Sequence, residues 1–197
     1  MAVRKIVSGM FMSLDGVVQA SDDWQFSYFD EDLLAGIGEG MQGTDAAVMG
    51  RVSFAGYNAL HVEHPDSPVL AFLERVDRYV ASTTVADTDW PGTTVLREDV
   101  YGHIAALKNQ PGGDILVAGS PTLVRGLLGR GLLDELNLFL LPIVVGSGDR
   151  LFPDESTGED VTRLQLKLAT SKTLRSGALK LQYVPDLGAG GAADRSY

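Results

Sequence analysis

The sequence predicts an α/β fold whose sheet is mostly parallel and carries an antiparallel hairpin at one edge. Segments with the apolar pattern of strands alternate repeatedly with segments that have the pattern of helices, as is typical of strand–helix–strand units in a parallel sheet. Near the C-terminus, residues 164–168 and 179–183 both alternate apolar and polar side chains, and a Ser-Gly turn at 176–177 lies between them. Such a pair predicts a hairpin with one buried face.

The central part of the chain is expected to form a strand, a helix and a second strand. Residues 115–118 are a short apolar run, typical of a strand that is buried on both faces of a sheet. Ser120 fits the cap of a helix that begins at Pro121, where the fixed φ of proline and its missing N–H are tolerated. The helix is expected to end near Gly129, and residues 136–141 form the next apolar run.

The preceding segments supply the other parallel strands and their helices. Turn chemistry at Asp15-Gly16 ends the first strand, and the acidic residues 30–32 suit a helix start because carboxylates complement the helix dipole. Residues 61–68, which include His61 and His64, are expected to form a loop. The expected strands cover residues 5–12, 46–49, 78–82 and 93–96, and the expected helices cover residues 30–41, 52–60, 69–75 and 99–109. One domain is expected over residues 1–186, with a flexible tail of small and polar residues at 187–197.

Composition argues against several classes of protein. The net charge is −10 and no cluster of Lys and Arg occurs, which disfavours nucleic-acid binding. The chain has no cysteine, so disulfides, thiolate nucleophiles and Cys-based zinc sites are excluded. The three histidines form no metal-ligand pattern. The longest apolar runs fall short of the roughly 20 residues that a membrane helix needs, and the N-terminus lacks a signal-peptide pattern. We therefore expect a soluble cytoplasmic protein.

Four segments end predicted strands with small or hydrogen-bonding residues. In an open parallel sheet, ligands bind outside the carboxyl ends of the strands, so we expect all four segments at one rim. Arg51 adds a fixed positive charge there, and serine and threonine hydroxyls are available. This set suits a phosphate-bearing nucleotide, although ordinary strand-ending turns remain the alternative. The segments are Ser13–Gly16, Gly50–Ser53, Ser82–Thr84 and Gly119–Thr122.

Carboxylates near this rim have two possible roles. Asp30, Glu31 and Asp32 either include a proton donor for a bound ligand or form a charged helix start. Asp15 either shapes its Asp-Gly turn or binds substrate. Neither a GxGxxG motif nor a P-loop is present, so the signatures of the common dinucleotide-binding and ATPase folds are missing.

Five motifs, taken in their order along the chain, resemble those of a known family. The resemblance is to the reductase domain of the bacterial bifunctional riboflavin-biosynthesis deaminase-reductase, which has a dihydrofolate reductase-like fold, and it covers roughly residues 4 to 184. The histidine–glutamate and cysteine motifs of the deaminase half are absent. The motifs are MSLDG at 12–16, VMGRVSF at 48–54, AGSP at 118–121, GLLDEL at 131–136 and PIVVGSG at 142–148, the last followed by Leu151-Phe152.

The resemblance implies an NADPH-dependent reductase with a three-layer dihydrofolate reductase-like fold. Arg51 would favour NADPH over NADH, since a guanidinium fits a phosphate bidentately. By the resemblance, Gly50 and Ser53 would contact the cofactor phosphates, and Ser82 and Thr83 would lie near the adenosine end. The pyrophosphate would be held by Gly119, Ser120, Pro121 and Thr122. The nicotinamide would contact the backbone around Met12 and would also contact Val18. Dihydrofolate reductases usually have Gly-Gly where this chain has Gly119-Ser120.

By the same resemblance, the reaction would reduce a ribosylamino-pyrimidine to its ribitylamino form, or reduce a similar small carbonyl- or imine-type substrate. Asp32 or Asp30 would donate the proton, although counting back from Gly50 places Leu34 at the family's carboxylate position. Two alternatives stay open. One is a pterin reductase of the dihydrofolate reductase type, and the other is a nucleotide-binding dimer without catalysis.

The apolar stretch from Leu136 to Val145 is long for the edge of a monomer's sheet. A second copy of the chain or the C-terminal hairpin could cover it, since exposed edges are commonly covered. The sequence alone does not separate these two arrangements. The family resemblance favours a homodimer.

Overall fold

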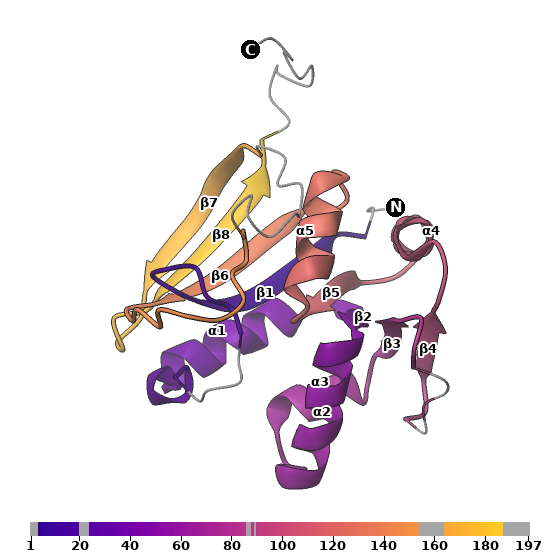
Figure 1. The fold of residues 1–197 in the computed structure, drawn as a ribbon, viewed down its shortest axis with the longest axis horizontal. Helices are drawn as coiled ribbons and strands as arrows, with labels where there is room; N and C mark the ends of the chain where they lie inside the picture. Colours follow the sequence, from indigo (N-terminus) through magenta and orange to yellow (C-terminus); the bar gives the residue numbers. More distant parts are fainter. Residues whose placement is uncertain (1–3, 20–23, 86–87, 89, 154–163, 187–197) are drawn as a thin grey trace.

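The structure, a computed structural model, describes residues 4–19, 24–85, 88, 90–153 and 164–186. One eight-stranded sheet runs through the described part, in the order β4-β3-β2-β5-β1-β6-β8-β7 (Figure 1). The first six strands are mutually parallel, whereas β8 is antiparallel to β6 and β7 is antiparallel to β8. The strands are β1 (Ile6–Ser13), β2 (Thr44–Gly50), β3 (Asp77–Ala81), β4 (Thr93–Leu96), β5 (Asp114–Ala118), β6 (Glu135–Leu141), β7 (Leu166–Thr173) and β8 (Leu179–Pro185).

Helices cover both faces of the sheet, so the fold has three layers, as the sequence predicts. One face carries α1, α2 and α3, and the other carries α4 and α5. The side chains of β2 show the division, because Val48 packs with α5 whereas Met49 packs with α2 and α3. The helices are α1 (Glu31–Met41), α2 (Arg51–Glu63), α3 (Pro68–Leu73), α4 (Val100–Lys108) and α5 (Pro121–Gly129), with a short 3-10 helix, η1 (Phe26–Tyr28), before α1.

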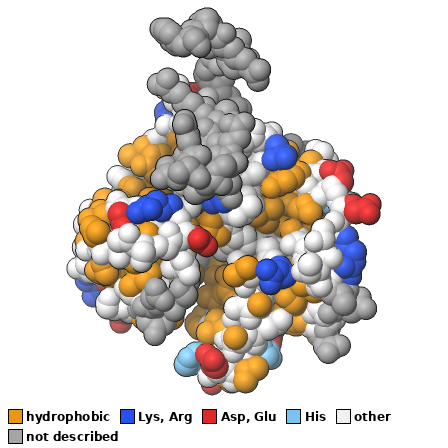
Figure 2. All heavy atoms as spheres, in the orientation of Figure 1, with side chains coloured by type: hydrophobic (Ala, Val, Ile, Leu, Met, Phe, Trp, Pro, Cys, Tyr) orange, Lys and Arg blue, Asp and Glu red, His pale blue; other side chains and the backbone are white. Residues whose placement is uncertain are grey.

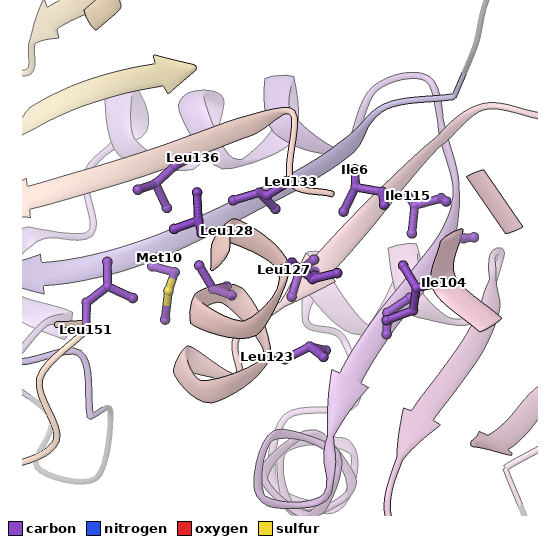
Figure 3. Packing of buried hydrophobic residues seen from close by; sticks show 14 of the residues in the cluster. Ile6, Met10, Ile104, Ile115, Leu123, Leu127, Leu128, Leu133, Leu136 and Leu151 are labelled. Carbon is purple, nitrogen blue, oxygen red and sulfur yellow. The ribbon is translucent and has the colours of Figure 1, made fainter. Parts of the chain in front are cut away.

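The largest core cluster lies between the sheet and the α4–α5 layer. Ile6 and Met10 of β1 meet Leu127 of α5 there (Figure 3). These side chains are 0 to 5 % exposed, and burying each one stabilises the fold by about 1.5–3 kcal/mol. The alternation along β1 therefore fixes which of its side chains face α5 and which face α1.

The order of the strands places a topological switch point between β2 and β5. The chain leaves β2 through α2 on one face and leaves β5 through α5 on the other. In open α/β sheets the crevice at such a point is where ligands bind. The topology therefore favours ligand binding near Gly50 and Ser120, which are the N-cap residues of α2 and α5.

The C-terminal hairpin is present, but its predicted burial is wrong in part. Leu164 and Leu168 are 42 % and 47 % exposed, because β7 is the outermost strand and no described helix covers it. Strand β8 pairs with β6 from Leu136 to Leu140, so the hairpin covers this apolar edge, which is one of the two arrangements that the sequence left open. The edge of β6 therefore gives no support for a dimer. The homodimer stays a prediction that rests on the family resemblance.

Other expectations can be compared with the structure directly. The predicted loop at 61–68 is wrong at its start, because α2 continues through His61 to Glu63. The tail at 187–197 lies outside the described residues. Among the residues that the structure describes, no helix has both the length and the apolar character required to cross a bilayer.

Ser8 offers a test of the core. Its hydroxyl is buried on β1 and has no hydrogen-bond partner among the described residues. A buried unsatisfied hydroxyl destabilises by about 1–3 kcal/mol, so Ser8→Ala is expected to raise the free energy of unfolding by about 1 kcal/mol in urea denaturation. Ser13→Ala is the matched control. The Ser13 hydroxyl is equally buried but bonds to Asp15 and to the backbone N–H of Val17, so this variant should lose stability. A loss in Ser8→Ala would contradict the prediction.

Candidate functional site

The turns after β2 and β5 are joined by hydrogen bonds at the carboxyl rim of the sheet. The backbone N–H of Gly50 donates to Ser120 Oγ at 2.7 Å, and Ser120 Oγ lies 2.8 Å from Ser53 Oγ. The sequence predicts that Ser120 caps α5. Ser120 does occupy the N-cap position, but its side chain forms no capping hydrogen bond. Its hydroxyl instead ties the two turns together. Two of the four predicted rim segments thus meet directly.

The turn after β5 is held in an unusual conformation. Gly119 and Ser120 both have positive φ values, 65° and 61°, and a non-glycine residue in this region stores strain that its surroundings must offset. A Cβ on Gly119 would lie 2.8 Å from Ser53 Oγ, closer than side chains normally approach. This turn therefore requires glycine at 119, and the hydrogen bonds of Ser120 offset the strain at 120.

Helices α2 and α5 begin side by side at this rim. The first N–H groups of a helix have no partner within the helix, and the helix dipole makes its N-terminus attractive to anions. Neither helix has a side-chain cap. The Arg51 side chain, in the first turn of α2, is exposed and makes no ion pair with any described residue. The arrangement suits phosphate groups.

Ser82 and Thr83 lie farther along the same rim, at the end of β3. Ser82 Oγ accepts hydrogen bonds from the N–H groups of Thr84 and Val85, at 3.1 and 3.0 Å. Its hydroxyl therefore orders the loop after β3. Thr83 is exposed. Strand β3 neighbours β2 on the side away from β5, so a ligand that reached both Ser82 and Ser120 would have to be extended.

Met12 and Val18, which the resemblance associates with the nicotinamide, pack against the largest core cluster. Along β1, Met12 alternates with residues that face the α1 side, namely Gly9 and Phe11. The side chain of Met12 is therefore on the α5 side of the sheet. The Val18 N–H donates to the carbonyl of Asp149 at 2.8 Å.

A residue that the sequence analysis did not select lies on the α1 side of β1. Gly9 is exposed although its strand is paired on both sides, with β5 and with β6. The surface is hollowed between α1 and the α2–α3 pair (Figure 2). A glycine inside an apolar strand often marks a close approach by a ligand, and this is the signal in the sequence that could have identified it.

Asp15 holds two loops together. Its carboxylate accepts hydrogen bonds from Ser13 Oγ at 2.7 Å, from the N–H of Val145 at 3.0 Å and from the N–H of Gly146 at 2.8 Å. The Ser13 hydrogen bond, followed by the two backbone hydrogen bonds, lowers the pKa of Asp15 to about 2. Both oxygens are thus occupied by the protein's own donors. This is the turn-shaping role, and substrate binding by Asp15 stays a prediction.

Asp30 and Asp32 stand at the start of α1 and are bound to the turn between β7 and β8. Asp30 accepts from the N–H of Leu33 at 2.8 Å, as a helix cap, and from the N–H of Ser176 at 3.1 Å. Asp32 accepts from Arg175 Nε at 2.9 Å, and the hydrogen bond from Arg175 lowers the pKa of Asp32. A lowered pKa keeps Asp32 ionised, which opposes donation of a proton. The proton-donor role of either residue stays a prediction.

The hydrogen bonds of Asp15 imply a pH dependence that can be measured. Because the pKa is about 2 in the folded chain and ordinarily 3.8, the carboxylate stabilises the fold above pH 4 and loses this effect as the pH falls towards 2. Asp15→Asn is therefore expected to lower the melting temperature at pH 7, and the gap to the wild-type chain should narrow between pH 4 and pH 2. Differential scanning calorimetry across this range checks the expectation, and a gap that stays constant would contradict it.

Comparison with known proteins now gives the family. The RibD C-terminal domain family matches residues 4–180. The uncharacterized protein YyaP of Bacillus subtilis (strain 168) is 27 % identical in an alignment of 187 positions that covers 91 % of this chain and 94 % of YyaP. A solved structure named for riboflavin biosynthesis, from Shewanella sp. PV-4, matches with a TM-score of 0.74 and 20 % identity over 92 % of this chain and 99 % of that one. The dihydrofolate reductase of Enterococcus faecalis, solved with NADP(H), matches with a TM-score of 0.62 and 16 % identity over 92 % of this chain and 96 % of that one. The fold is therefore dihydrofolate reductase-like, and the chain belongs to the RibD C-terminal domain family.

Proposed function

We propose that this protein is an NADPH-dependent reductase of a small carbonyl- or imine-type substrate. Membership in the RibD C-terminal domain family supports a reductase of the riboflavin-pathway kind. The observation that carries the proposal is the pair of helix N-termini joined through Ser120 Oγ, with the exposed Arg51 beside them. The protein has a net charge of −10, which repels an anionic cofactor. A local site of positive potential would offset this repulsion.

The described residues fit a dinucleotide that lies along the rim. The turns at Gly50–Ser53 and Gly119–Thr122 would hold the pyrophosphate between α2 and α5, and Arg51 would bind the 2′-phosphate. Ser82 and Thr83, one strand farther out, would lie near the adenosine. The cleft between α1 and α2 would then receive the nicotinamide end. The tight approach of Gly119 to Ser53 supports this fit, because it allows backbone rather than side chains to face the phosphates.

The cofactor supplies the hydride, and the protein supplies position and a proton. The joined turns fix the phosphates and so limit where the nicotinamide can lie. The proton would come from the carboxyl group of Asp32 or Asp30, directly or through a water molecule. Because Arg175 holds Asp32 ionised, this ion pair must loosen before Asp32 can carry a proton at neutral pH.

Arg51→Ala tests the cofactor assignment. Charged hydrogen bonds contribute about 1.5–3 kcal/mol, so the variant is expected to bind NADPH about tenfold or more weakly while NADH binding changes little. Isothermal titration with both cofactors measures this difference. Arg75→Ala is the matched control, because Arg75 follows α3 before β3 begins, away from the rim, and its side chain bonds, among the described residues, to the carbonyl of Ala71 alone. Equal losses for NADPH and NADH in Arg51→Ala would defeat the assignment.

A second candidate function is a nucleotide-binding protein without catalysis. The specific observation in its favour is that both Asp30 and Asp32 are already bound by groups of the β7–β8 turn. The two candidates differ in turnover, which can be followed as NADPH oxidation with a panel of pterins, flavin precursors and small carbonyl compounds. The panel also separates a pterin reductase from the proposed activity.

Variants at the start of α1 make this comparison sharper. If Asp32 donates the proton, Asp32→Asn is expected to abolish turnover, whereas Arg175→Met should retain it and shift its pH profile upward. The shift follows because removing the guanidinium lets the pKa of Asp32 rise. Turnover that is lost in Asp32→Asn or Asp30→Asn rejects the non-catalytic candidate. Activity that survives both substitutions contradicts the proton-donor assignment.

A further inference from the structure

The middle of β1 has an open space above it. Strand β1 lies between β5 and β6, where a residue is ordinarily covered, and its neighbours Ser8 and Met10 are 0 % and 5 % exposed. Gly9 between them is exposed, and a Cβ added to it would meet no atom within 4 Å. At this position the backbone of β1 is therefore open to contact by a ligand group.

One polar side chain stands beside this opening without a partner. Asn137 on β6 is in register with Gly9 and interrupts the otherwise apolar run from Leu136 to Leu141. Its side chain is half-buried and forms no hydrogen bond among the described residues. On the same face, Phe139 and Leu141 are buried under α1. An amide at this position lowers the apolar character of the strand, and no hydrogen bond to a described residue accounts for it.

The position of Asn137 separates it from the proposed phosphate site. Gly9 pairs with Ala118 of β5, which is two residues, or about 7 Å along the strand, from Ser120. Asn137 lies one strand beyond Gly9 on the side away from β5, about 5 Å farther across the sheet. A dinucleotide held at the β2–β5 rim would reach Gly9 before Asn137. The amide therefore faces the space left for the substrate.

Aromatic rings flank the same opening. Phe11 follows Gly9 on the same face of β1, and its ring centroid lies 5.3 Å from that of Phe29. Phe29 and Phe26 remain 36 % and 55 % exposed, although they contact each other at 5.5 Å. These three aromatic side chains suit contact with the face of a flat apolar ring. Asn137 would supply the polar group at the edge of the same ring.

We infer that Asn137 is a specificity-determining residue for substrate and that Gly9 provides the space in which the substrate ring lies. The inference rests on the proposed function for the identity of the site. The carboxamide presents a donor and an acceptor side by side, so it selects a planar ring whose edge carries the complementary acceptor and donor. A site built to hydrogen-bond a ligand rejects an analogue that lacks the group, because the amide is then left unpaired.

The experiment uses two flat probes of similar shape. Lumazine has two fused rings with neighbouring N–H and C=O groups, and quinoxaline has two fused rings without an N–H group. Saturation-transfer NMR and titration on the full chain with NADPH present are expected to show lumazine binding about tenfold more tightly than quinoxaline. Asn137→Leu should remove this preference and leave NADPH binding unchanged. Asn109→Leu, at the end of α4 on the opposite face, is the control and should behave as the wild type.

Gly9→Val tests the space itself. A β-branched residue suits a strand, and a Cβ at this position meets no atom within 4 Å, so the variant is expected to fold and to melt at a higher temperature. It should lose binding of both probes while it keeps binding of 2′,5′-ADP, which needs only the phosphate rim. Undiminished lumazine binding in either Asn137→Leu or Gly9→Val would overturn the inference. Loss of the lumazine preference in Asn137→Leu, together with equal losses of NADPH and NADH binding in Arg51→Ala, would keep the inference and reject the cofactor assignment instead.

Discussion

The hydroxyl of Ser120 is the contact on which the rim depends. It accepts the Gly50 N–H and lies against the Ser53 hydroxyl, so one oxygen fixes two strand-to-helix turns from opposite faces of the sheet. Without it the Gly50 N–H would be left unpaired at the start of α2, and the left-handed backbone at Ser120 would have nothing to offset its strain. The relative position of the two helix N-termini follows from this contact.

A second set of contacts fixes the loops that border the rim on the other side. Asp15 binds the backbone at Val145 and Gly146, and Val17 forms an antiparallel bridge with Arg150. The loop after β6 is therefore tied to the loop after β1. These contacts are made mostly by backbone groups and one short side chain, so little side-chain conformational entropy is lost when they form. Rigid loops of this kind suit a site where a ligand must be held in one orientation.

The sequence was sufficient for the elements and their order because each one has a local cause. Apolar runs of strand length, Pro121 at a helix start and the Ser-Gly turn at 176–177 all act within a few residues, and the structure confirms the elements that they predict. The convergence of Gly50 with Ser120 also followed, since carboxyl ends of parallel strands meet at one edge.

The features that could not be predicted from the sequence depend on contacts between segments that are far apart in the chain. The hydroxyl of Ser120 bonds to a residue 70 positions away rather than capping its own helix. The exposure of Leu168 depends on β7 being outermost, which local alternation does not reveal. Gly9 and Asn137 become meaningful only when β1 and β6 are placed side by side. The partners of Asp30 and Asp32, likewise, come from a turn near the other end of the domain.

The position of β1 has a consequence for how the chain folds. The first strand to be synthesised sits between β5 and β6, so neither of its neighbours exists until residues 114–141 have been made. The start of α1 likewise waits for Arg175 and Ser176. Contacts this distant in sequence slow folding, because the loops that they close are long. On the ribosome, β1 is therefore expected to remain without its native pairing until these residues have been synthesised, and an unpaired strand of this kind is prone to aggregate.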